Sequence, residues 1–274
     1  MSRPYLAGPR PLAFAHRGGA ALWPENTLVA FEGAIRLGLR HLETDLHITR
    51  DGALVTLHDP TVDRTTDGRG PAAALTLAEL QRLDAGHRFT PDGGATFPYR
   101  GQGVRVPALD EVLALHPDVR VNLEIKSPDP AAARVVWAFI HHHRVHDRVL
   151  VASEHATVVR EFRAQSRGRV ATSAGAAEVL RFWLAARLGR GPRRRPDYDA
   201  LQIPPTHGPL TVIHPRLLDA ARRHGLHVHA WTIDDPAEMR RLIDLGVDGL
   251  VSDRPDRLAD LLGIAPDGAR APPR

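Results

Sequence analysis

Two carboxylates on one strand-like segment are the first residues of this chain that suggest chemistry. Residues 42–48 alternate between apolar and polar side chains as a strand does, and they include Glu43 and Asp45. Side chains two positions apart on a strand face the same side, so these two carboxylates point at one spot. Such a pair favours a cation between them.

A histidine follows the carboxylates along the same segment. The dipeptide Asp51-Gly52 is typical of a tight turn, and the apolar run after it ends at His58. We expect residues 46–58 to form a hairpin that brings this imidazole back beside the carboxylates. An imidazole titrates near neutral pH, where proton transfer is efficient, so His58 is a candidate acid or base.

Two further strand-like segments carry residues of the same kinds. The apolar run of residues 12–15 is followed by His16 and Arg17. Residues 121–125 carry Glu124 and are followed by the only lysine of the chain, Lys126. A second imidazole, a third carboxylate and two cationic side chains are therefore also available.

The three carboxylates predict a site for one divalent cation. Glu43, Asp45 and Glu124 offer the oxygen ligands that a hard ion, Mg2+ or Ca2+, prefers, with water completing its shell. The chain has no cysteine, so a thiolate metal site is excluded. In the structural alternative these acids lie on a solvated face and pair with arginines, but acids on two separate strands favour the metal site.

The histidines also have an ordinary interpretation, because the chain has 16 of them and most are expected at the surface. His16 and His58 differ in that each ends an apolar run. Each is also followed by a charged residue that is able to orient it. We interpret these two as the catalytic pair.

In chain order these segments read His-Arg-Gly, Glu-Asn-Thr, Glu-x-Asp, His-Asp and Glu-x-Lys, with Trp-Thr and Asp-Arg-Pro near the end. The series resembles the glycerophosphodiester phosphodiesterase family, and the resemblance spans nearly the whole chain. The residues themselves support phosphodiester chemistry. The resemblance implies metal-dependent hydrolysis of a small-molecule glycerophosphodiester to sn-glycerol 3-phosphate and an alcohol.

The other candidate residues surround this proposed centre. The planar fork of Arg17 is suited to two phosphate oxygens, or else forms a salt bridge at the rim, and Lys126 would place a point charge near the same phosphate. Glu25 and Asn26 are expected to orient the first loop, and Asn26 to cap the helix after it. Trp231 either packs in the core or walls the substrate pocket.

Two other functions stay open at this point. A lysophospholipase D acting on lysophospholipids would share every catalytic residue and differ in accepting an acyl chain. A catalytically silent barrel would bind a ligand without turning it over. The intact set of two histidines and three acids argues against the silent barrel.

The elements that position these residues alternate regularly between strands and helices. Eight such repeats predict an α/β fold, the (β/α)8 TIM barrel, whose chemistry lies at the C-terminal ends of its strands. We expect one domain over residues 1–264, a small insertion at about 60–107 between the second and third barrel strands, and a flexible tail at 265–274. The predicted strands are 12–17, 41–47, 121–125, 148–152, 169–173, 199–203, 226–232 and 248–252.

Composition also limits the possible partners, cofactors and cellular location. The net charge is only +4, and the basic residues are spread among acids except for one cluster late in the chain. No nucleic-acid signature is present, so no nucleic-acid partner is expected. Gly18-Gly19 lacks the rest of a dinucleotide fingerprint, so no nucleotide cofactor is implied. The absence of an apolar signal core and of cysteine favours a cytoplasmic location.

Residues 176–195 depart from a plain soluble barrel. The predicted helix 176–188 is apolar around much of its circumference and runs into five arginines: Arg187, Arg190, Arg193, Arg194 and Arg195. In one interpretation its apolar face packs on the barrel and the arginines are solvated. In the other, its end makes peripheral contact with an anionic membrane, where each arginine adds on the order of 1 kcal/mol.

Overall fold

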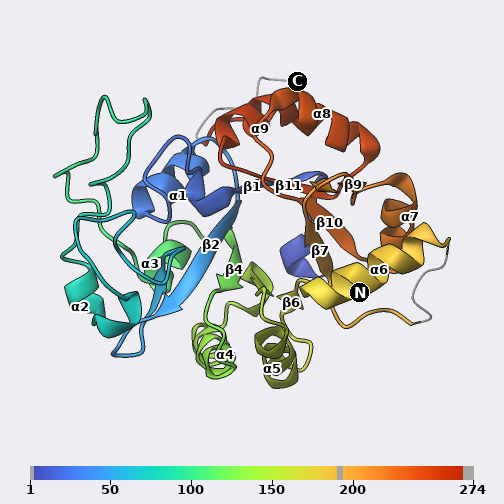
Figure 1. The fold of residues 1–274 in the computed structure, drawn as a ribbon, viewed down its shortest axis with the longest axis horizontal. Helices are drawn as coiled ribbons and strands as arrows, with labels where there is room; N and C mark the ends of the chain where they lie inside the picture. Colours follow the sequence, from blue (N-terminus) through green and yellow to red (C-terminus); the bar gives the residue numbers. More distant parts are fainter. Residues whose placement is uncertain (1–2, 190–193, 268–274) are drawn as a thin grey trace. The chain divides into compact units, whose positions relative to one another are not determined.

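The computed structural model describes residues 3–189 and 194–267 of the chain, and within them the backbone forms two compact units (Figure 1). Unit 1 comprises Met1–Ala13 and Ser127–Val251. Unit 2 comprises Phe14–Lys126 and Ser252–Arg274. Each unit is described by itself below, and the single-domain boundaries expected from the sequence stay a prediction.

The strands of unit 2 position the predicted chemical residues. They are β1 (Leu12–Ala15, of which Phe14 and Ala15 belong to this unit), β2 (His41–Ile48), β3 (Leu54–Thr56) and β4 (Arg120–Ile125). The strand β2 lies between β1 and β4 and pairs with both in parallel, and Figure 1 shows β2 and β4 side by side. The strand β3 folds back antiparallel on β2, which confirms the predicted hairpin.

The strands of unit 1 continue the parallel pattern. They are β5 (Val149–Ala152), β6 (Ala171–Thr172), β7 (Ala200–Ile203), β10 (His227–Ala230) and β11 (Gly249–Ser252, of which Ser252 belongs to unit 2). Parallel pairing joins β5 to β6 and β7 to β10 to β11, and a parallel bridge between Ser173 and Ala200 links the two groups. Both units together supply eight parallel strands alternating with helices, which confirms the predicted (β/α)8 barrel class.

The helices fall in the intervals expected between the strands, and α4 and α5 lie side by side in Figure 1. Their bounds are α1 Leu28–Arg36, α2 Leu77–Leu80, α3 Leu109–Ala114, α4 Ala131–His143, α5 Ala156–Ser166, α6 Ala176–Arg187, α7 Pro215–Arg223, α8 Pro236–Leu245 and α9 Pro255–Leu262. Short 3-10 turns are η1 Pro4–Leu6, η2 His16–Gly18, η3 Ala72–Ala74 and η4 His146–Arg148.

The small hairpin of β8 (Thr206–His207) and β9 (Leu210–Thr211) was not predicted, because two-residue strands show no periodicity.

The start of α1 differs from the prediction by one residue. The cap is Thr27, whose hydroxyl accepts from the Ala30 amide at 3.3 Å, and not Asn26. Asn26 instead takes the left-handed conformation, with φ of 56°, which asparagine tolerates better than most residues. Its side chain is therefore free to turn toward the strands.

A close approach explains the glycine of the His-Arg-Gly motif. Gly18 has φ of +84°, and a Cβ placed there would lie 2.6 Å from the Cβ of Ala30. Any side chain would push η2 away from α1. The residues that precede this glycine are thereby held against the helix.

The insertion at about 60–107 has a small core of its own. Its buried apolar residues cluster with Val55 and Leu57 of the hairpin segment; they are Val62, Ala72, Leu80, Ala85, Val104 and Val106. The helix α2 begins with a capping box between Thr76 and Glu79. The insertion therefore packs directly against the segment that carries His58.

The beginning of the predicted tail packs on α1. The Asp267 amide donates to the Arg36 carbonyl at 3.0 Å, and Arg40 forms an ion pair with the Asp267 carboxylate at 2.7 Å. Residues 268–274 of the predicted tail lie outside the described residues. Across residues 3–189 and 194–267, no helix has the length and apolarity needed to cross a membrane.

The insertion core yields a stability prediction. Leu80 is fully buried, so Leu80→Ala should lower the free energy of unfolding by about 2–5 kcal/mol through lost burial and the cavity left behind. Leu180 is 56% exposed, and Leu180→Ala should change it by less than about 0.5 kcal/mol. Chemical denaturation of both variants measures the difference; equal effects would show that the insertion core does not stabilise the fold.

Candidate active site

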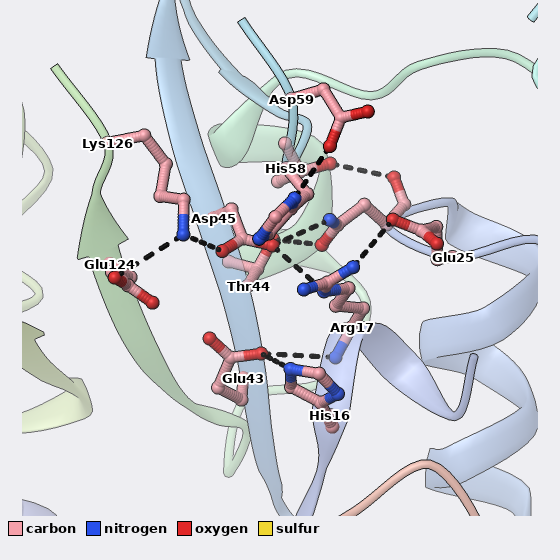
Figure 2. Close-up of polar contacts among 12 residues, drawn as sticks. His16, Arg17, Glu25, Glu43, Thr44, Asp45, His58, Asp59, Glu124 and Lys126 are labelled. Atoms are coloured by element: carbon pink, nitrogen blue, oxygen red, sulfur yellow. Dashed lines mark hydrogen bonds and ion pairs between the residues drawn. The ribbon is translucent and has the colours of Figure 1, made fainter. Parts of the chain in front are cut away.

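The three predicted carboxylates converge in unit 2, as Figure 2 shows. The register places Asp45 of β2 directly beside Glu124 of β4, and Glu43 beside Asn122. One carboxylate oxygen from each of Glu43, Asp45 and Glu124 lies within 4.8 Å of the others. Glu43 and Asp45 are buried, whereas Glu124 is partly exposed. The two strands therefore form one compact group of oxygen donors.

Two cationic side chains neutralise part of this charge. The Lys126 ammonium lies 3.3 Å from Asp45 Oδ1 and 3.4 Å from Glu124 Oε1. The Arg17 guanidinium lies 3.3 Å from Asp45 Oδ2, and the Arg17 amide donates to Glu43 Oε2 at 3.2 Å. Asp45 thus has a cation on each side, whereas within residues 3–189 and 194–267 no arginine or lysine side chain forms an ion pair with Glu43.

The pKa directions follow this distribution of charge. Burial and repulsion from Asp45 and Glu124 raise the pKa of Glu43 to about 8, against an opposing pull from His16. Burial also acts to raise the pKa of Asp45, but the nearby Lys126 and Arg17 outweigh it and lower that pKa. A divalent cation fits this donor set, because it would add the positive charge that the crowded acids lack and because all three ligands are oxygen atoms.

The His16 ring is held by a carboxylate from the far end of the chain. Its Nδ1 lies 2.6 Å from Asp253 Oδ1, and its Nε2 lies 3.8 Å from Glu43 Oε2. Burial lowers the pKa of His16, but the hydrogen bond with Asp253 and the charge of Glu43 outweigh it, so the pKa is raised. The prediction that the adjacent Arg17 orients this ring is wrong.

Asp253 is a site residue to which the sequence analysis gave no role. It lies 237 positions after His16 and directly follows the strand β11. Its only sequence signal was the Asp-Arg-Pro motif at positions 253–255. Nothing in the local pattern around His16 indicates so distant a partner.

The His58 ring is oriented by its own neighbour, as predicted. Its Nδ1 lies 2.7 Å from Asp59 Oδ1. The other oxygen of Asp59 accepts from Arg64 Nε at 2.7 Å, and hydrogen bonding to Arg64 lowers the pKa of Asp59 to about 2. Asp59 is therefore an anion at neutral pH and a fixed acceptor for the imidazole.

Arg64, which the sequence did not single out, connects Asp59, beside His58, with Arg17 of the first loop. Its Nη1 and Nη2 donate to the two oxygens of Glu25, each at 2.7 Å. Glu25 also accepts from Arg17 Nη1 at 3.0 Å (Figure 2). Ion pairs therefore run without a break from Asp59 through Arg64 and Glu25 to Arg17.

Asn26 supports Asp45 from the first loop. Its Nδ2 donates to Asp45 Oδ2 at 3.1 Å, while its Oδ1 accepts from the Thr44 hydroxyl at 2.7 Å. The hydroxyl of Thr56 donates to the Asn26 carbonyl at 2.8 Å. The amide is thus fixed with its donor toward the carboxylate, whereas the capping role assigned to Asn26 belongs to Thr27.

Arg17 and Trp231 were each predicted with two alternative roles. Arg17 contacts the carboxylates of Glu25 and Asp45, the salt-bridge alternative, and its contact with phosphate stays a prediction. Trp231 belongs to unit 1, directly after β10, and is 45% exposed, so the core alternative is wrong. Its place as a pocket wall stays a prediction.

Comparison with known proteins adds independent evidence. The chain is 37% identical over 256 residues to the probable glycerophosphodiester phosphodiesterase 2 of Mycobacterium tuberculosis, covering 92% of this chain and 90% of that one. It is 34% identical over 260 residues to the glycerophosphodiester phosphodiesterase of Caldanaerobacter subterraneus, covering 92% and 98%.

A solved structure supports the fold. It is the glycerophosphoryl diester phosphodiesterase domain of an uncharacterized protein from Mycobacterium tuberculosis, with a TM-score of 0.82 at 20% identity, covering 91% of this chain and 98% of that one. The model of the Glycerophosphoryl diester phosphodiesterase family matches residues 16–257, which include both histidines and all three acids. The chain belongs to the glycerophosphoryl diester phosphodiesterase family.

Proposed function

We propose that this protein hydrolyses glycerophosphodiesters to sn-glycerol 3-phosphate and an alcohol. The observation that carries the proposal is the pair of imidazoles, His16 and His58, each with Nδ1 on a carboxylate, in the same unit as three crowded acids. Family membership supports the substrate class, since the two relatives above are named for this activity. An intact acid/base pair disfavours a silent binding barrel.

Glu43, Asp45 and Glu124 would hold one divalent cation, Mg2+ or Ca2+. A bound cation of this kind polarises a phosphoryl oxygen and lowers the pKa of an attacking hydroxyl. The protein contributes the charge that selects it, because three acids within 4.8 Å attract a small divalent ion more strongly than a monovalent one.

The histidines would move the protons. The contact between Nδ1 and a carboxylate fixes each ring and leaves Nε2 as the atom that exchanges a proton. One imidazole removes a proton from the attacking hydroxyl of the substrate's own glycerol, and the other protonates the leaving alkoxide. Water then opens the resulting cyclic phosphate to give sn-glycerol 3-phosphate. Asp253 and Asp59 stabilise whichever ring is the imidazolium.

Arg17 and Lys126 would position the phosphate. Both side chains are partly buried and already lie within ion-pair distance of Asp45. A bound phosphodiester would accept from their remaining donors, with the guanidinium fork of Arg17 suited to two oxygens at once.

The metal centre gives a first test. Glu43→Gln should abolish Mg2+ or Ca2+ binding, measured by isothermal titration calorimetry of metal-stripped protein, and should leave the fold intact, because burial already disfavours the charged form of Glu43. Affinity for the cation should rise as the pH approaches about 8, since ion and proton compete for this carboxylate. Exposed Glu154 provides the matched control Glu154→Gln, and full turnover by metal-stripped enzyme would contradict the centre.

The histidines give a second test. His16→Ala and His58→Ala should each lower kcat by roughly 10^2 to 10^4, the usual contribution of a positioned acid or base. The double variant should lose less than the product of the two, because both rings serve one proton-transfer cycle. Glycerol 3-phosphate release from glycerophosphocholine is the measurement, with exposed His142→Ala as the control. A near wild-type rate in either variant would remove that histidine from the mechanism.

A second candidate substrate, a lysophospholipid, is favoured by the surface of α6. Phe182 and Ala186 of this helix are buried, whereas Leu180, Leu184 and Leu188 are 56%, 48% and 71% exposed. Spaced four residues apart, these leucines share one face. We propose that this face meets an anionic membrane and that the enzyme then acts as a lysophospholipase D.

The hairpin of β8 and β9 contacts α6, and the described arginines of the predicted cluster have different surroundings. Trp183 Nε1 donates to the Thr211 carbonyl at 3.4 Å, which ties α6 to the hairpin, and Leu210 there is 48% exposed. Arg187 lies over the Trp183 ring, and Arg194 is exposed. Arg195 pairs with buried Asp199 at 2.9 Å while its own side chain stays half exposed, and Arg190 and Arg193 lie outside the described residues.

Vesicle co-sedimentation tests the membrane contact. Wild-type protein should bind anionic and not neutral vesicles, and the triple substitution of Leu180, Leu184 and Leu188 by serine should remove binding by removing the apolar contact. The same variant should lose turnover of lysophosphatidylcholine and keep that of glycerophosphocholine. Indifference of the wild type to lipid charge would eliminate this candidate.

A further inference from the structure

Unit 1 contains a cavity of about 370 Å³ that shares no residue with the proposed catalytic site. It lies where the parallel strands β7 and β10 begin, since its lining includes Asp199, one residue before β7, and His227, the first residue of β10. Active sites of such barrels use the other ends of the strands. Four arginines complete the charged lining: Arg3, Arg10, Arg195 and Arg222.

The carboxylate in the lining is outnumbered by these cations. Arg3 Nε and Arg195 Nη2 both donate to the same oxygen of Asp199, at 3.1 and 2.9 Å. The other oxygen of Asp199 accepts from the Thr172 amide at 3.2 Å. One buried anion therefore serves two guanidinium groups, and a net positive charge remains at this wall.

The second wall combines Arg10 with His227. Arg10 pairs with Asp248, and its Nη2 lies 2.9 Å from His227 Nε2. A guanidinium only donates, so Nε2 accepts and Nδ1 carries the proton of this ring. His227 is 5% exposed, and its Nδ1 has no hydrogen-bond partner among the described residues. This nitrogen is itself buried, so the group that this wall offers to the cavity is the half-exposed guanidinium of Arg10.

The guanidinium of Arg222 forms only a weak ion pair. Its Nη1 lies 3.2 Å from Asp219, and both side chains are at least half exposed. Exposed ion pairs of this kind contribute little and are easily exchanged. Its Nη2 also donates to the Gly246 carbonyl at 2.9 Å.

We propose that this cavity binds a small phosphate-bearing anion, held between the Arg3–Arg195 wall and Arg10, with Arg222 closing on it. Guanidinium groups bind phosphate through two parallel hydrogen bonds, and four of them around one cavity favour a dianion over a monocarboxylate. The cavity volume is within the range of small-molecule sites, so an organic phosphate fits as well as inorganic phosphate.

Calorimetric titration with inorganic phosphate and, separately, with glycerol 3-phosphate tests the site. Both titrations use the full chain with chelator present. The background is Arg17→Gln, so that the proposed catalytic site contributes less binding. Arg195→Gln and Arg222→Gln should each weaken binding at least about 10-fold, the loss of one charged contact. The control Arg134→Gln removes a similarly exposed ion pair, with Glu161 at 3.3 Å, and should change nothing.

The two probes and two variants separate the outcomes. Tighter binding of glycerol 3-phosphate than of inorganic phosphate identifies an organic ligand, and equal binding identifies the free anion; either supports the proposal. Arg195→Gln removes one of the two arginines paired with buried Asp199 and could destabilise the protein. Arg222→Gln leaves that ion pair intact, so it tests the site even in that case. The proposal would be overturned if neither substitution changed binding, or if no binding were detected up to about 10 mM ligand. The arginines would then only stabilise the packing of the N-terminal segment.

Discussion

The pairing of β2 with β4 is the constraint on which the site depends. It places Asp45 beside Glu124 and brings Glu43 into the same group, with two of the three acids buried. Buried like charges repel, and the structure offsets this with Lys126 and Arg17 on Asp45 while leaving the pKa of Glu43 raised. The site stores an unfavourable charge distribution that a divalent cation would relieve.

The cationic side chains around this group of acids are also fixed by ion pairs. Arg17 is fixed by Glu25, and Glu25 is fixed by Arg64, which also holds the carboxylate behind His58. One arginine in the insertion segment thus links Asp59, the carboxylate beside His58, to Glu25 and Arg17 of the first loop. Movement of the insertion would therefore disturb the surroundings of His58 and of Arg17 together.

Unit 1 contributes surface features of a different kind. Its helix α6 buries one side and leaves a line of leucines in solvent, and its strand starts surround a cavity rich in arginine. The exposed leucines form an apolar patch, and the excess of guanidinium groups over acids makes a positive one. The first underlies the proposed membrane contact and the second the proposed anion site.

Most of the fold could be predicted from the sequence, because strand and helix periodicity is local. The eight strands, the hairpin after β2, and the side-by-side orientation of Glu43 and Asp45 all follow from patterns within a few residues. The partner of His58 was also predictable, since Asp59 is its neighbour in the chain.

The remaining features depended on tertiary structure, because they join residues far apart in the chain. Asp253 meets His16 across 237 positions of the sequence, and Arg64 reaches Glu25 only through the folded insertion. Asn26 turns to Asp45 because Thr27 takes the cap, a choice between neighbours that propensity alone does not decide. The sequence by itself determined the candidate groups for the chemistry, and the tertiary structure decided which partner orients each one, because hydrogen-bond partners are set by distance in space and not along the chain.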